Sequence, residues 1–127
     1  MAPVFLELAE VLEIHTDQIA RYGGMPGVRD LGLLQSALAQ PPASFGGQFL
    51  HADVFEMAAA YLFHIVQNHP FIDGNKRVGA VAALVFLRLN DCQVKLTNAE
   101  LESQVLSVAR GKTGKAAIAQ CFRDRSQ

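Results

Sequence analysis

A nine-residue stretch, HPFIDGNKR, gathers most of the side chains in this sequence that could do chemistry together. It begins at His69 and separates two apolar segments, AAAYLFHIVQN before it and VGAVAALVFLRLN after it. Charged and polar groups are costly to bring near a core unless they are paired or used. The stretch is therefore the first candidate for a functional site.

The start of the following helix is where an anion would bind. The apolar pattern predicts a buried helix from Lys76 to Asn90. The first N–H groups of a helix have no partner within it, and the helix dipole places partial positive charge there. Lys76 and Arg77 add two positive charges, and Gly74 lets the backbone approach a ligand. Phosphate is the natural ligand for such a site.

Two further residues of the stretch complete a chemical set. Asp73 puts an oxygen ligand beside the predicted phosphate site, which is how Mg²⁺ is usually held. His69 is the only side chain of the stretch whose ordinary pKa suits proton transfer near neutral pH. A base, a metal ligand and a phosphate clamp together suit transfer of a phosphate-containing group to a hydroxyl. Phe71 and Ile72 are interpreted more simply as anchors into the core.

Each of these residues also has a structural explanation. Asp73 can equally cap the helix, with or without binding metal, and Asn75 can be a turn residue. Lys76 and Arg77 can form a solvated helix end, and a lone histidine is more often structural than catalytic. The occurrence of all these residue types in one short loop before a buried helix favours the functional interpretation.

The elements around the stretch are predicted by apolar spacing. Phe45 and Phe49, which flank the Gly46-Gly47 pair in ASFGGQFL, predict a short hairpin. Thr97 begins a capping box, TNAE. With no linker or repeat, the sequence predicts one all-α domain over residues 1–127, with about six helices and this hairpin. The helices are expected at residues 7–22, 31–40, 54–68, 76–90, 97 to about 109, and 116–123.

Composition limits the classes of partner. The formal net charge is −1 and the pI is about 6.4, which argues against nucleic acid as a direct ligand. The sequence has no apolar run that is long enough for a bilayer and no signal peptide at its start, so no membrane is expected. Cys92 and Cys121 are expected to be buried free thiols, as in a reducing cytosol. We expect a soluble cytoplasmic protein.

HPFIDGNKR resembles the signature of the Fic/Doc family, whose general form is H-x-F-x-[DE]-[GA]-N-[GK]-R. The upstream segment RYGGMPGVRDLGLLQSALAQP is also similar to the Doc branch, the death-on-curing toxins of type II toxin–antitoxin systems. The resemblance extends from about Ile14 to about Asn90. It implies a compact helical bundle with the signature in a loop between two central helices. It also implies a flap hairpin that docks a target peptide by strand addition, made here of Phe45, Gly46, Gly47, Gln48 and Phe49.

Two departures from the pattern separate the branches of the family. Typical Fic enzymes, which transfer AMP from ATP to a protein hydroxyl, have glycine where Lys76 stands and a second arginine where Ala80 stands. The lysine is the form found in Doc toxins. These resemble kinases: they bind the nucleotide in the reversed sense and place the γ-phosphate on a threonine of elongation factor Tu, which arrests translation. Pro70 is a minor Fic-like feature.

The resemblance assigns roles to residues of the stretch. His69 would be the general base on the target hydroxyl, and Asp73 would hold Mg²⁺. ATP would be the co-substrate, with its phosphates bound by Gly74, Asn75, Lys76 and Arg77. Doc toxins are paired with a Phd-like antitoxin, whose C-terminal segment folds into a helix in an apolar groove of the toxin. Two alternatives stay open: transfer of AMP or another NMP to a protein hydroxyl, and an inactive Fic-fold binding module. Against the latter, no signature side chain is missing.

Overall fold

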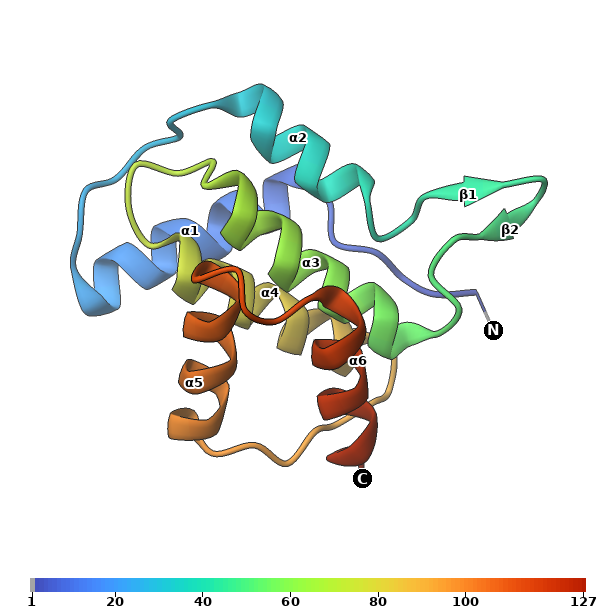
Figure 1. Cartoon of the computed structure of the whole chain (residues 1–127). Coiled ribbons are helices and arrows are strands. Elements are labelled where there is room, and N and C mark those ends of the chain that lie inside the picture. The colour runs from blue at the N-terminus through green and yellow to red at the C-terminus, as the bar shows by residue number, and fades with distance from the viewer. Residues whose placement is uncertain (1) are drawn as a thin grey trace.

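The computed structural model describes residues 2–127, and within them it contains six helices and one hairpin (Figure 1). The predicted all-α class is confirmed, and each helix lies within one or two residues of its predicted bounds. The elements are α1 (Leu8–Tyr22), α2 (Leu31–Ala39), β1 (Ser44–Phe45), β2 (Gln48–Phe49), α3 (Val54–Asn68), α4 (Asn75–Leu89), α5 (Asn98–Ala109) and α6 (Lys115–Asp124).

Helices α3 and α4 form the centre of the molecule, and the other helices pack around them (Figure 1). Small residues let the two central helices approach closely. A Cβ added at Gly79 would lie 3.0 Å from Val66 Cγ2 and 3.2 Å from the carbonyl oxygen of Leu62. One buried apolar cluster includes residues of all six helices. This packing fixes the two ends of the loop that joins α3 to α4, which is the HPFIDGNKR stretch.

The hairpin forms for the reason that the sequence suggests. Gly46 and Gly47 have φ values of 61° and 81°, as a two-residue type I′ turn requires. The turn pairs Ser44 with Phe49 and Phe45 with Gln48. The hairpin projects from the body of the molecule beyond the end of α2 (Figure 1).

The hairpin lies near the C-terminal end of α4. Its Phe49 ring is 5.7 Å from that of Phe5, which in turn stacks at 5.6 Å on Phe86 of α4. The HPFIDGNKR loop lies at the opposite, N-terminal end of the same helix. From Asn75 to Phe86 the helix rises by roughly 16 Å, at 1.5 Å per residue.

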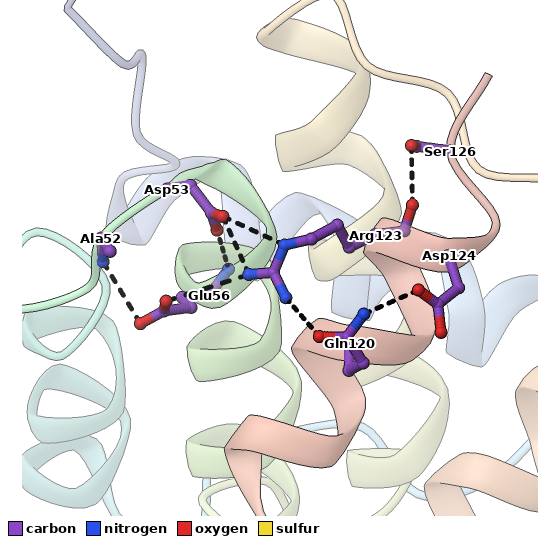
Figure 2. A network of polar contacts seen from close by, with 7 residues as sticks. All are labelled: Ala52, Asp53, Glu56, Gln120, Arg123, Asp124 and Ser126. Atoms are coloured by element: carbon purple, nitrogen blue, oxygen red, sulfur yellow. Dashed lines mark hydrogen bonds and ion pairs between the residues drawn. The ribbon is translucent and has the colours of Figure 1, made fainter.

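Helix α6 is tied to the start of α3 by the polar network in Figure 2. The Asp53 carboxylate accepts the N–H of Glu56 at 2.9 Å and so caps α3. The same carboxylate pairs with Arg123 Nη2 of α6 at 2.8 Å. Loss of solvation opposes ionisation of Asp53, but the N–H of Glu56 and the Arg123 guanidinium outweigh it and lower the pKa.

A second polar cluster joins α6 to α3. Lys115 Nζ, at the start of α6, lies 3.0 Å from His64 Nε2 and 3.4 Å from His51 Nε2. Burial, the Lys115 charge and then His51 lower the pKa of His64 to about 4. The imidazole of His64 is therefore neutral at pH 7 and can accept a hydrogen bond from the lysine.

Two smaller expectations concern cysteines and membranes. Cys92 and Cys121 are free thiols as expected, but each is half-buried rather than buried. Within residues 2–127, no helix has both the length and the apolar character needed to cross a membrane.

Acid is expected to destabilise the fold through His64. In the unfolded chain its pKa returns to about 6.5, above the folded value of about 4. Between these values the unfolded state binds more protons, so stability falls as the pH is lowered through that window. The melting temperature, followed from pH 7 to pH 4.5, should fall less steeply in a His64→Gln variant than in the wild type. Parallel curves for the two proteins would show that His64 does not carry this dependence.

Candidate active site

His69 ends α3 in a left-handed backbone conformation, with φ of 51° and ψ of 52°. This conformation is unfavourable for a residue with a Cβ and needs support from its surroundings. The support comes from Arg29, whose Nε donates to the carbonyl of His69 at 2.8 Å and whose Nη2 donates to that of Asn68 at 3.2 Å. The turn leaves the His69 side chain exposed at the surface.

Asn75 closes the loop on itself. Its buried side chain accepts the N–H of Phe71 at 2.8 Å and donates to the carbonyl of the same residue at 3.0 Å. Both polar ends of the amide are thereby bonded to the backbone of the loop. What Asn75 presents to a ligand is its backbone N–H, at the first position of α4.

Phe71 is the anchor of the loop, as predicted, and it is fully buried. Its ring stacks on that of His15 from α1, with centroids 4.0 Å apart and planes 8° apart. His15 Nε2 also lies 2.9 Å from the carbonyl oxygen of Asp73. The predicted anchoring role of Ile72 is wrong, because this side chain is 47% exposed. Phe71 forms a β-bridge with Val28, and successive side chains of an extended segment point to opposite sides.

Residues 23–30, the turn-rich GGMPGVRD segment, brace the loop from outside. The N–H groups of Arg29 and Asp30 both donate to the carbonyl of Pro70, at 2.7 and 3.0 Å. The N–H of Ile72 donates to the carbonyl of Gly27 at 3.1 Å. The loop is thus bonded to a second segment that lies about forty residues away in the sequence.

The N-terminus of α4 is open to a ligand. Its N-cap is Gly74, in a left-handed conformation with φ of 80°, and no side chain caps the helix. The first helical hydrogen bond joins the N–H of Val78 to the carbonyl of Gly74 at 2.9 Å. The N–H groups of residues 75–77 therefore have no acceptor within the helix. Because Gly74 and not Asp73 is the N-cap, the alternative that Asp73 caps α4 is not supported.

Asp73 is held as a carboxylate at the rim of this opening. Its oxygens accept the N–H groups of Met25 at 3.2 Å and Gly74 at 3.0 Å. These two bonds, and to a smaller degree the charges of Arg77 and His15, lower the pKa of Asp73. Residues 2–127 contain no group of three or more His, Cys, Asp or Glu side chains that could hold a metal ion. Any ion at Asp73 would therefore need its other ligands from water or a substrate.

The two cations of the loop behave differently. Arg77 is fixed over the C-terminal end of α1, where Nη2 donates to the carbonyl of Gly23 at 3.0 Å and Nη1 to that of Gln18 at 3.3 Å. Its guanidinium also lies 5.8 Å from the centre of the Tyr22 ring. Lys76 is exposed, and within residues 2–127 it takes part in no ion pair. Lys76 is therefore the cation that is free to move toward a ligand.

A cleft of about 460 Å³, here called the His69 cleft, brings the predicted site residues together. It is lined by Val66, Gln67, His69, Asp73, Gly74, Asn75, Lys76, Arg77 and Ala109. The predicted docking residues of the hairpin are not among them, because the hairpin lies at the other end of α4. Sequence reasoning missed His15, Arg29 and Met25, which position the loop through contacts between distant segments.

Comparison with known proteins gives a consistent assignment. The model of the Fic/DOC family matches residues 5–87. The chain belongs to the Fic/DOC family. It is 33% identical over 114 residues to "Protein kinase doc" of Escherichia phage P1, which covers 90% of this chain and 89% of the relative. It is 41% identical over 73 residues to "Toxin Doc" of Mycolicibacterium smegmatis, which covers 58% of this chain and 56% of that relative.

The expected family is thus confirmed, and both relatives bear the name Doc. The family match includes the whole HPFIDGNKR loop and most of α4. It also includes α1 and residues 23–30, which supply the residues that hold the loop. The part of the chain beyond residue 87, including α5 and α6, lies outside the family match.

Asn75→Asp is expected to loosen the loop. The substitution replaces the donor that faces the carbonyl of Phe71 with a second acceptor and buries a charge. Losing a buried hydrogen bond in this way costs about 1–3 kcal/mol. The free energy of unfolding, measured with urea, should fall by that amount. Asn98→Asp, an exposed change of the same kind in the first turn of α5, is the control and should have little effect. Equal stability of the two variants would contradict the closing role of Asn75.

Proposed function

We propose that this chain is a Doc-like toxin that acts as a protein kinase. It would transfer the γ-phosphate of ATP to a threonine of a target protein. Elongation factor Tu is the expected target, and arrest of translation is the expected result. The observation that carries the proposal is the His69 cleft, in which an exposed imidazole lies beside an uncapped helix N-terminus with a free lysine. The name of the phage P1 relative, "Protein kinase doc", supports the same reaction class.

The N-terminus of α4 would bind the phosphate to be transferred. Three backbone N–H groups, those of residues 75–77, are available there together with the positive end of the helix dipole. Lys76 adds a mobile positive charge. Arg77 stays bonded to the end of α1 and would attract the phosphate through its positive charge without touching it. Gly74 has no side chain to cover these donors. The site therefore favours an anion with several oxygens over a single carboxylate.

His69 would act as the general base. Its imidazole would accept the proton of the target hydroxyl as the hydroxyl oxygen forms a bond to the γ-phosphorus. The bond between that phosphorus and the bridging oxygen of the β-phosphate would break, and ADP would leave with the electron pair. Arg29 would be a positioning residue, because it holds the backbone turn that places His69 at the cleft.

Asp73 is the residue that would hold Mg²⁺. A single exposed carboxylate suits this ion, which usually keeps several waters and takes one or two carboxylates together with substrate phosphates. The lowered pKa of Asp73 keeps it charged at neutral pH. The ion would neutralise phosphate charge as the transfer proceeds.

Two partners follow from the same proposal. The hairpin of Phe45, Gly46, Gly47, Gln48 and Phe49 would dock the target, and its Phe45 side chain is 83% exposed. Because the hairpin lies at the far end of α4, a target bound there would reach the His69 cleft with a second segment. A Phd-like antitoxin would inhibit the toxin by placing its C-terminal helix in an apolar groove.

Label transfer tests the proposal directly. The protein would be incubated with Mg²⁺, elongation factor Tu and ATP labelled at either the γ- or the α-phosphate. Label from the γ-phosphate alone is expected on a threonine. In a His69→Ala variant the rate of label transfer should fall roughly a hundredfold or more, because proton transfer by a positioned base contributes 10²–10⁴-fold to the rate. His69 is exposed, so the variant should keep the melting temperature of the wild type.

Each of the other possible labelling results would support a different function. Label from the α-phosphate alone would identify an AMP transferase that uses the same cleft. No label from either position, on elongation factor Tu or in a whole-cell lysate, would favour an inactive binding module. Full activity in the His69→Ala variant would contradict the assigned base.

A further inference from the structure

The carboxylate of Asp73 is held in place by residues that lie outside the His69 cleft. Its Oδ2 accepts the N–H of Met25 at 3.2 Å, across 48 positions of the sequence. Its Oδ1 accepts the N–H of the adjacent Gly74 at 3.0 Å. Met25 and its neighbour Gly24 belong to the turn that follows α1, and neither residue lines the cleft.

Gly24 provides the space that the carboxylate occupies. Its φ of 112° lies in a region that residues with a side chain rarely adopt. A Cβ added at Gly24 would lie 2.9 Å from Asp73 Oδ2 and 3.1 Å from Ile19 Cδ1. Both distances are well below a normal contact between non-bonded heavy atoms. Any other residue at this position would therefore push the carboxylate away from the N–H of Met25.

His15 of α1 holds the backbone of the same aspartate. Its Nε2 lies 2.9 Å from the carbonyl oxygen of Asp73, so this nitrogen carries the ring proton. The ring is 4% exposed and stacks on Phe71, which fixes its direction. The carbonyl and the carboxylate of Asp73 are thus both bonded to α1 or to the turn that follows it.

A fixed carboxylate suits the binding of a divalent cation. A carboxylate offers about four lone-pair sites, and the N–H groups of Met25 and Gly74 use two of them. The Asp73 side chain is exposed, so an ion can approach it from solvent. Groups that orient a ligating carboxylate typically contribute 10–100-fold to metal affinity. Mg²⁺ is especially sensitive to ligand direction, because it demands nearly ideal octahedral geometry.

We propose that Gly24, Met25 and His15, here called the Asp73 seat, are positioning residues that set the affinity of the His69 cleft for a divalent cation. This inference rests on the proposed function, in which Asp73 holds Mg²⁺. It adds that the direction of the carboxylate is determined by α1 and the turn after it, and that glycine is required at position 24 for this reason.

Binding of Mn²⁺ to the nucleotide-free protein tests the inference independently of kinase activity. Mn²⁺ prefers the same oxygen ligands as Mg²⁺, and it broadens the NMR signals of nearby amides. In the wild type it should broaden the amide signals of residues 73–75, and excess Mg²⁺ should reverse the effect. In a Gly24→Ala variant the Mn²⁺ concentration needed should rise at least about tenfold. Asp73→Asn should abolish the broadening.

Gly23→Ala is the matched control for Gly24→Ala. Gly23 also has a positive φ, of 83°, but a Cβ added there would have no atom within 4 Å. The control therefore strains the backbone without touching Asp73, and its Mn²⁺ affinity should stay near that of the wild type. His15→Phe tests the seat from α1, even if Gly24→Ala does not fold. It keeps a ring against Phe71, lacks the nitrogen that bonds Asp73, and should also weaken Mn²⁺ binding.

Melting temperatures give a second readout that needs no metal. In an Asp73→Ala background the bond to Met25 is already absent, and so is the carboxylate that a new Cβ would displace. Gly24→Ala should therefore lower the melting temperature less in that background than in the wild type. Gly23→Ala should lower it equally in both.

The contrary outcomes are distinct. The same Mn²⁺ affinity in Gly24→Ala and the wild type would overturn the inference, as would broadening that persists in Asp73→Asn. Equal effects of Gly24→Ala on the melting temperature in the two backgrounds would also contradict it. A wild-type protein that shows the expected Mn²⁺ pattern but transfers no label from ATP would overturn the proposed function and still support the seat.

Discussion

The pair of hydrogen bonds from the Asn75 side chain to the backbone of Phe71 is the constraint on which the site depends. It closes the loop into a compact turn against the first residue of α4. Once the turn is closed, Phe71 must enter the core, where it meets His15, and Ile72 must face outward. The same turn leaves the helix N-terminus uncapped and His69 exposed beside it. A buried amide that satisfies both a donor and an acceptor suits this task, because an unpaired buried polar group is costly.

The site is also organised by opposed helix ends. The C-terminal end of α1 meets the N-terminal end of α4, and Arg77 lies between them. The arginine thereby donates to two carbonyls at the end of α1 while its charge stays near the N-terminus of α4. His15 reaches from the same helix to the carbonyl of Asp73. Helix α1 thus positions the loop without contributing any residue to the lining of the His69 cleft.

The helices and the residues of the candidate site could be predicted from the sequence. The reactive residues are contiguous, and the helices have clear boundaries. The Gly46-Gly47 pair predicts the hairpin through backbone conformation alone, and the capping box at Thr97 predicts the start of α5. The contacts of Arg29 with the His69 carbonyl and of Met25 with the Asp73 carboxylate were not predictable, since each joins residues forty or more positions apart. The burial of the Asn75 side chain was also not predictable, although its bonds to Phe71 are local. Its residue type suits phosphate, and only the fold shows that its side chain is bonded to the loop.

In the proposed function, the sense in which ATP binds decides which phosphorus faces His69 and so which group is transferred. It is tested most directly by a crystal structure of the protein with Mg²⁺ and a non-hydrolysable ATP analogue. We expect the γ-phosphate at the N–H groups of residues 75–77, nearest to His69. An α-phosphate in that position, with the γ-phosphate directed toward Ala80, would contradict the account and identify a nucleotidyl transferase.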